Sequence, residues 1–379
     1  MIYFQANRAL ALALAAFSAF ELATGHSEKF RLSLLLYSSI LIAMVTTYAM
    51  RNLVGQDRYR RFGALLLPTS LGIYLFLWSN NVWLLAVGWS LSGLGATALV
   101  NHANNERSRR ALRGMRFWFI LSDCALWGAV ILAHAHQLDL INAESTFAPV
   151  NLKVSIAILL AVAGIIRSGG FPAMMWLIRT SEAPSPLSAF LHAGIVNGFG
   201  YLLVTFPVIR EARVGIISLA LLTIFLALVV LRHRHDEKGK LANGTSMQMA
   251  FMALEGVLGL SGAVLLHIVG HGSYKSWSFL RAGGVPLRKK NSMPLTHSRK
   301  RNPAKATFFI LLYVVTMSFS FFQLQSDHLL NFAVLSVALT STFIFINKLP
   351  DVLLVPATLL SLVITALYIV LIHTCLLYT

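Results

Sequence analysis

The chain has 379 residues, of which 57% are hydrophobic and only 12% are charged. Soluble domains average about 25% charged residues, so this composition excludes an ordinary water-soluble protein and indicates many membrane-spanning helices. The formal net charge is +17. The basic residues stand in short loops between apolar segments, which argues against nucleic-acid binding. The two cysteines form neither a disulfide framework nor a thiolate metal site.

Apolar segments of about 17–25 residues, the length that crosses a bilayer, recur along the chain. They predict an all-α polytopic membrane protein with about thirteen transmembrane helices. The predicted spans are 7–24, 31–50, 62–78, 81–100, 116–134, 153–182, 186–207, 214–231, 245–260, 262–283, 305–323, 329–347 and 353–373. The first span contains Glu21 and runs on into further spans, so we do not expect a cleavable signal peptide.

The loops between these spans alternate in charge. Basic clusters occur in the regions 51–61, 107–116, 232–240 and 281–305, whereas the loops 135–151 and 324–328 are neutral or acidic. A cytoplasmic N-terminus puts every basic cluster on the cytoplasmic side, where anionic lipid attracts it. The odd number of spans then predicts a periplasmic C-terminus in a bacterial inner membrane.

Two spans carry residues that disfavour a continuous helix. The sixth contains the sequence Ser-Gly-Gly-Phe-Pro over 168–172, and the tenth contains Gly270 and Gly272. Proline removes a helix hydrogen bond and glycine weakens the local helix. We therefore expect two discontinuous helices, of the kind that build ion sites in secondary transporters. A simple packing kink is the alternative for both.

Ionisable residues inside predicted spans are candidates for moving charge. Asp123 lies in the fifth span, where it could instead pair with an arginine of the preceding basic loop. Arg167 lies beside the break in the sixth span and, because a guanidinium stays protonated, can only hold a counter-charge. His192 follows in the seventh span as a possible proton relay. Glu255, in the ninth, is either a partner for the lysine of the next span or a surface residue.

The tenth span carries His267, His271 and Lys275 at positions i, i+4 and i+8, on one side of a helix. Each such group costs roughly 2.5–3.5 kcal/mol or more to insert into the membrane, so the spacing indicates a path for protons or ions. A desolvated lysine changes its protonation readily, and Lys275 is therefore the leading candidate. The two histidines lack the glutamate of a zinc-binding HExxH pattern and an evident third ligand, so we predict no metal site and no cofactor.

These motifs resemble a known family. The segments 167–177 and 182–194, the second containing Pro-Ser-Pro-Leu-Ser-Ala-Phe-Leu-His-Ala-Gly, are similar to the central signature of antiporter-like, proton-translocating subunits of respiratory complex I and Mrp antiporters. Residues 245–252 and 267–279 are similar to the family's second half. The resemblance implies one integral membrane domain over 1–379, with a first antiporter-like half at 62–207, a partial second half at 214–283 and C-terminal helices at 305–379.

Within this family, the motifs around His192 and from Leu265 to Lys275 look most similar to membrane subunits of the DAB inorganic-carbon accumulation complexes. The resemblance implies that the chain is not itself an enzyme. It would couple an H+ or Na+ gradient to CO2 hydration on a large soluble, zinc-containing, DabA-like partner at the cytoplasmic face, and so accumulate bicarbonate. Where the family usually has a Trp-Glu pair the chain has Trp89 and Ser90, and Arg167 stands where the family usually has lysine. Ser90 cannot carry the proton that the glutamate would, and Arg167 should not deprotonate. The sequence therefore leaves open whether the first half-channel is active.

Two alternatives remain open from the sequence. One is a proton-pumping subunit of a complex I or hydrogenase-type assembly, which predicts many membrane partners. The other is a degenerate subunit that only anchors a partner on the membrane, an alternative motivated by Ser90 and Arg167.

Overall fold

The computed structural model describes residues 1–24, 28–56, 58–103, 106–141, 149–180, 183–234 and 236–282. Within these ranges the regular secondary structure consists of helices alone. The chain divides into two compact units, 1–285 and 286–379, and all described residues belong to the first. An all-α membrane fold is thereby confirmed.

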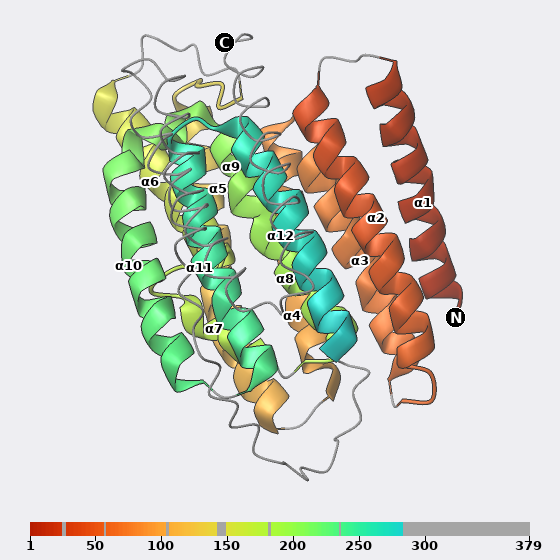
Figure 1. Cartoon of the computed structure of the whole chain (residues 1–379). Helices are drawn as coiled ribbons and strands as arrows, with labels where there is room; N and C mark the ends of the chain where they lie inside the picture. The colour runs from red at the N-terminus through yellow and green to blue at the C-terminus, as the bar shows by residue number, and fades with distance from the viewer. Residues whose placement is uncertain are drawn as a thin grey trace, which may run out of the picture. The chain divides into compact units, whose positions relative to one another are not determined.

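Most of the helices lie side by side along one direction (Figure 1). Their bounds are α1 Ile2–Ala23, α2 Lys29–Asn52, α3 Tyr59–Trp78, α4 Val82–Val100, η1 Asn101–Ala103, α5 Glu106–Ala135, α6 Val150–Arg167, α7 Met174–Arg179, α8 Ser185–Ala193, η3 Ile195–Asn197, α9 Gly198–Thr205, η4 Pro207–Ala212, α10 Arg213–His233, α11 Glu237–Val257 and α12 Ser261–Ala282.

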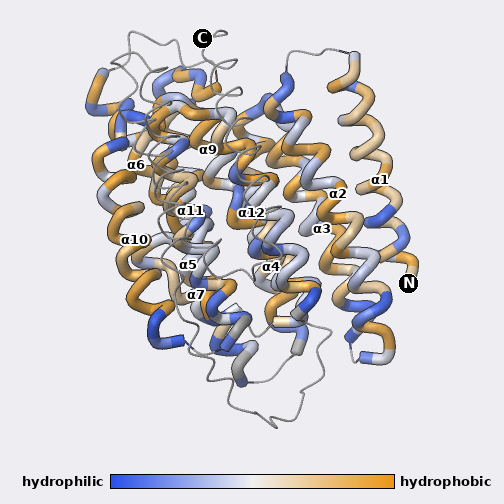
Figure 2. The backbone as a smooth tube through the Cα atoms, viewed as in Figure 1, coloured by the Kyte–Doolittle hydropathy of each residue, from blue (hydrophilic) through white to orange (hydrophobic). Residues whose placement is uncertain are grey.

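Each of the first ten predicted spans coincides with a helix or a helix pair. Eight helical segments of the described chain are long and apolar enough to cross a membrane: 2–23, 29–52, 59–78, 82–100, 108–135, 150–167, 185–205 and 207–233. α11 and α12 are as long but more polar, and Figure 2 draws pale and blue stretches within them, whereas α10 is orange along most of its length. The last three predicted spans lie outside the described residues, so the count of thirteen stays a prediction.

Two helices begin well before the apolar segment that predicts them. α5 starts at Glu106 rather than near 116, and α11 starts at Glu237 rather than near 245. Both extensions are polar. The Asp236 side chain accepts a hydrogen bond from the Gly239 backbone N–H at 2.7 Å and so caps α11. Hydropathy detects the part of a helix that enters lipid and misses the part that continues into water.

The sixth span is broken where its sequence predicts. α6 ends at Arg167 and α7 begins at Met174, with Gly169 in the left-handed region at φ +72° between them. Phe171 donates its backbone N–H to the Thr223 hydroxyl of α10 at 2.9 Å. This partner from a neighbouring helix meets the rule that non-helical backbone at membrane depth must be satisfied by protein or water.

The expected break in the tenth span is wrong. α12 is helical from Ser261 to Ala282 through both of its internal glycines. The second interruption instead falls in the seventh span, where α8 ends at Ala193 and the short η3 turn precedes α9. Gly272 serves packing, because a Cβ there would collide with the Tyr37 hydroxyl.

Close backbone contacts between α3 and α4 help to position Trp89 and Gly93, which lie against Arg167. A Cβ on Gly72 would lie 2.5 Å from the Ser92 backbone nitrogen, and one on Gly88 would lie 2.5 Å from the Phe76 backbone nitrogen. Small residues permit such approach between membrane helices, where close packing holds helices together. Neighbours elsewhere include α1 with α2, α5 with α6, α8 with α12, and α11 with both α10 and α12.

Candidate functional site

Lys275 lies in the interior of the helical unit, with only 4% of its surface exposed. Its Nζ donates a hydrogen bond to the Leu241 carbonyl of α11 at 2.6 Å. A Cβ on Gly244, one turn further along α11, would lie 3.3 Å from the same Nζ. The missing side chain at that position leaves room for the ammonium group.

The two histidines of α12 continue the same stripe. His267 contacts Glu255 of α11, with Nδ1 and Oε2 2.9 Å apart, and the rings of His267 and His271 have centroids 5.9 Å apart. Glu255 is 4% exposed. The sequence offered two alternatives for Glu255, a surface residue or a partner of Lys275. The structure instead makes Glu255 the partner of His267.

His192 joins this stripe from α8. Its ring is fully buried and stacks on Phe279 of α12, with centroids 4.5 Å apart and planes inclined by 21°. Its Nδ1 lies 3.2 Å from the Thr245 hydroxyl of α11. His192, His271 and Lys275 are close enough to interact electrostatically. Three helices thus bring together the protonatable groups of what we call the Lys275 cluster: Lys275, His271, His267, His192 and Glu255.

Several nitrogens of the Lys275 cluster have no hydrogen-bond partner among the described residues: His192 Nε2, His267 Nε2 and both ring nitrogens of His271. Buried polar atoms in folded proteins are nearly always paired, and exceptions concentrate where function requires them. Each imidazole here keeps a position that can receive or release a proton.

Arg167 occupies a second charged region, together with Asp123. Its Nη2 donates to Asp123 Oδ1 at 2.6 Å and its Nη1 donates to the Trp89 carbonyl at 3.2 Å. The guanidinium carbon lies 4.4 Å from the centroid of the Trp89 ring and 4.3 Å from that of Phe119. A Cβ on Gly93 would lie 2.6 Å from Nη1, so glycine makes the space for this side chain.

The partner of Asp123 differs from the one the sequence suggested. An arginine of the preceding basic loop was the expected partner, but the carboxylate pairs with Arg167, which the break after α6 leaves inside the bundle. We call these two residues the Arg167–Asp123 pair. Ser90, the next residue of α4 after Trp89, accepts a hydrogen bond from Trp127 Nε1 at 3.0 Å. The acidic group of this region therefore comes from α5 and not from α4.

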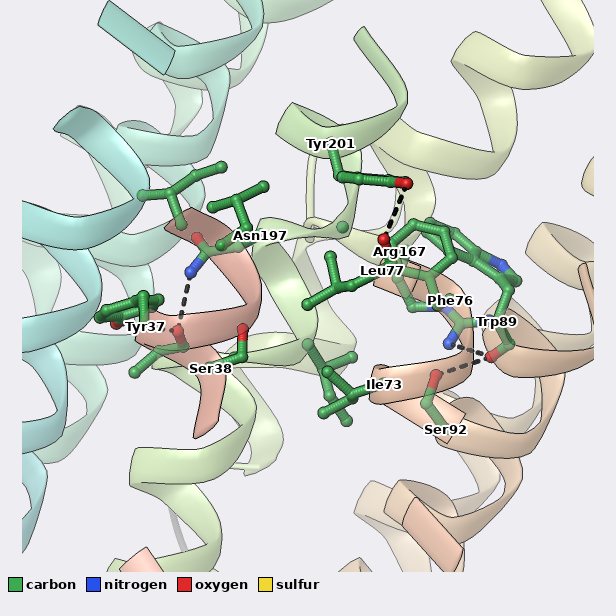
Figure 3. Close-up of a pocket in the computed structure, with 16 residues that line it drawn as sticks. Tyr37, Ser38, Ile73, Phe76, Leu77, Trp89, Ser92, Arg167, Asn197 and Tyr201 are labelled. Carbon is green, nitrogen blue, oxygen red and sulfur yellow. Dashed lines mark hydrogen bonds between the residues drawn. The ribbon is translucent and has the colours of Figure 1, made fainter. Parts of the chain in front are cut away.

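A cavity of about 40 Å³ extends from Arg167 towards α2 and the break after α8. A volume of this size holds one or two water molecules. Figure 3 shows Arg167, Trp89 and Ser92 at one end and Tyr37, Ser38 and Asn197 at the other. Tyr37 lies against Gly272 of α12, which places the far end of the cavity beside the Lys275 cluster.

The sequence comparisons agree with this architecture. The transmembrane family described as NADH:quinone oxidoreductase/Mrp antiporter matches residues 79–354, more than half of the chain. The chain belongs to this family. Its charged residues inside the helical unit thus lie in a scaffold that other members of the family share.

Among curated relatives, a probable inorganic carbon transporter subunit DabB of Hydrogenovibrio crunogenus is 33% identical over 63% of this chain and 48% of that protein. The probable subunit DabB of Bacillus subtilis is 30% identical over 66% and 51%. The chain therefore spans about half the length of the curated relatives it matches. A solved archaeal respiratory membrane complex, the membrane-bound sulfane sulfur reductase, shares the fold with a TM-score of 0.65 at 15% identity, over 73% of this chain and 64% of that one.

Two further residues, Thr245 and Tyr37, lie beside the Lys275 cluster. Neither was among the site residues predicted from the sequence. Thr245 lies in the segment 245–252 that the family resemblance singles out, but nothing in its residue type marks it as a partner of His192. Tyr37 lies in a span outside the matched region, and its contact with α12 depends on tertiary packing alone. Within the described residues, no group of three histidine, cysteine or acidic side chains is arranged to hold a metal ion.

Proposed function

We propose that this family member is an ion-translocating membrane subunit in which the Lys275 cluster carries H+ or Na+. The observation that supports it is the burial of one ammonium and three imidazoles from α8 and α12, together with one carboxylate from α11. Charges at membrane depth are costly unless they serve a path or a partner. Imidazoles with unpartnered nitrogens next to a lysine provide steps between which a proton can move.

We further propose that the ion gradient drives inorganic carbon accumulation. The relatives named DabB support this step, since they are described as probable inorganic carbon transporter subunits. The chain would act with a large soluble, zinc-containing, DabA-like subunit that hydrates CO2, and would not catalyse that reaction itself. We place the chain in a bacterial inner membrane, with a cytoplasmic N-terminus, a periplasmic C-terminus and the partner on the cytoplasmic side, because positively charged loops favour that side.

Growth of a bacterial strain without carbonic anhydrase tests this proposal. The chain, expressed together with the soluble subunit that co-purifies with it, should restore growth in air. Lys275→Ala should abolish growth while the two subunits still co-purify, because the path loses its buried amine.

Lys29→Ala is the matched control, since Lys29 is exposed at the start of α2. Growth of the Lys275→Ala strain at the wild-type rate would disprove the proposal. Full growth of a Lys275→Ala, His271→Ala double variant would point to a subunit that only anchors its partner.

A pumping subunit of a respiratory or hydrogenase-type complex is the second candidate. It is supported by the match to the NADH:quinone oxidoreductase/Mrp antiporter family and by the fold shared with the sulfane sulfur reductase complex. Co-purification with quinone-linked oxidoreductase subunits, in place of one soluble partner, would favour this candidate.

A further inference from the structure

Tyr37 of α2 lies outside the region that matches the family, and it was not among the site residues predicted from the sequence. Its hydroxyl donates to the Ala193 carbonyl at 3.3 Å, the last residue of α8. Ala193 directly follows His192, and its carbonyl also accepts a hydrogen bond from Asn197 Nδ2 at 2.7 Å. The interruption of the seventh span leaves this carbonyl available, and two side chains hold it in place.

The same hydroxyl fits into a notch on α12. A Cβ on Gly272 would collide with the Tyr37 oxygen and would approach the Ala193 carbonyl to 2.9 Å. Gly272 stands between His271 and Lys275 on α12, so Tyr37 touches the backbone between two members of the Lys275 cluster. The side-chain hydroxyl of Ser273 also lies within hydrogen-bonding range of Tyr37.

We propose that Tyr37 is a positioning residue of the Lys275 cluster, which fixes the end of α8 against α12 and so sets His192 relative to His271 and Lys275. The inference rests on the proposed function and names a part of its machinery. The groups that face His192 are Lys275 and His271 from α12, Tyr37 through the Ala193 carbonyl from α2, and the neutral Thr245 from α11. Removing the Tyr37 oxygen changes one of these constraints and leaves the others.

The chain provides matched controls for both sides of this contact. Tyr48, on the same helix as Tyr37, donates its hydroxyl to the Leu280 carbonyl of α12 at 3.0 Å, and no cluster residue takes part in that bond. Gly270, one half-turn before Gly272, has no atom within 4 Å of the position a Cβ would take. Tyr48→Phe and Gly270→Ala therefore repeat the chemical changes away from the contact.

The experiment measures ion flux into proteoliposomes, thermal unfolding in detergent, and the nuclear magnetic resonance signals of nitrogen-labelled histidine, with His192→Gln assigning the His192 ring. Tyr37→Phe should lower flux about fivefold, the effect of one lost hydrogen bond. Its melting temperature should stay close to that of Tyr48→Phe. Gly272→Ala should lower flux further, and Gly270→Ala should leave flux at the wild-type level. The His192 signals should move in Tyr37→Phe and stay in place in Tyr48→Phe.

Equal flux and equal His192 signals in Tyr37→Phe and Tyr48→Phe would overturn the inference, even if Gly272→Ala fails to fold. The proposed function fails separately, when wild-type protein gives no flux that Lys275→Ala removes. In that case the His192 signals of the two tyrosine variants still decide whether Tyr37 positions this ring.

Discussion

Arg167 and Lys275 are both buried cations, but the protein holds them in opposite ways. Arg167 has a carboxylate at 2.6 Å, a carbonyl at 3.2 Å and an aromatic ring on each side. Lys275 donates a hydrogen bond to the Leu241 carbonyl and occupies the space left by the missing side chain of Gly244. Among the described residues, no carboxylate lies within ion-pair distance of Lys275. The first cation is neutralised in place, whereas the second keeps a charge that only the loss of its proton removes.

This difference separates two roles within one helical unit. A guanidinium stays protonated in proteins, so the Arg167–Asp123 pair is a fixed dipole and a packing element. An amine can release its proton when it is desolvated. The proposed ion path therefore runs through the Lys275 cluster, and we expect the region around Arg167 to shape the bundle.

Exchanging the two cation types gives the largest expected effect. Lys275→Arg should reduce proteoliposome ion flux at least about tenfold, since a guanidinium cannot release its proton near neutral pH. Arg167→Lys should keep at least about half of the flux, because an ammonium still pairs with Asp123. Comparable flux in the two variants would mean that the regions do not differ in this way.

Breaking the Arg167–Asp123 pair tests the second role. Asp123→Ala should destabilise the protein by about 3–5 kcal/mol, because it leaves a buried guanidinium without its counter-charge. Glu106→Ala is the control on the same helix: it removes the exposed partner of Arg110, 3.2 Å away, and should cost at most about 0.5 kcal/mol. Thermal unfolding in detergent measures both, and equal shifts would contradict a structural role for the buried pair.

The sequence predicts the parts of this comparison that depend on local pattern. Spans follow from apolar length, the break after Arg167 follows from the Gly-Gly-Phe-Pro sequence, and the common face of His267, His271 and Lys275 follows from helical spacing. These features need only a few neighbouring residues.

Pairings between distant helices could not be predicted in the same way. Asp123 and Arg167 are 44 residues apart, and the choice between Arg167 and a loop arginine depends on where the broken helix leaves the guanidinium. The glycine pattern of α12 likewise has two explanations, a break or a notch, and only the position of Tyr37 distinguishes them. Hydropathy carries no information about which faces meet.

A second arginine–aspartate contact, at the start of α11, sharpens the comparison because it lies outside the spans. Arg234 Nε donates to Asp236 Oδ1 at 2.9 Å, and the two side chains are 30% and 54% exposed. The hydrogen bond from Arg234 is the largest cause that lowers the pKa of Asp236, and the backbone N–H of Gly239 adds to it. The chemistry is that of the Arg167–Asp123 pair, but water and salt screen it.

Asp236→Ala should therefore cost only about 1 kcal/mol, the typical value of a lost helix cap. Because the folded protein has the lower pKa, the ionised carboxylate stabilises it fully above the unfolded value and loses that effect as the pH falls through the folded value. The melting-temperature difference between wild type and Asp236→Ala should shrink between about pH 6 and about pH 3. Asp236→Asn, which keeps a capping oxygen without the charge, should show a smaller dependence on pH. A constant difference from Asp236→Ala across that range would mean that the cap acts through its hydrogen bond alone, and that the charge of Asp236 adds nothing at this exposed site.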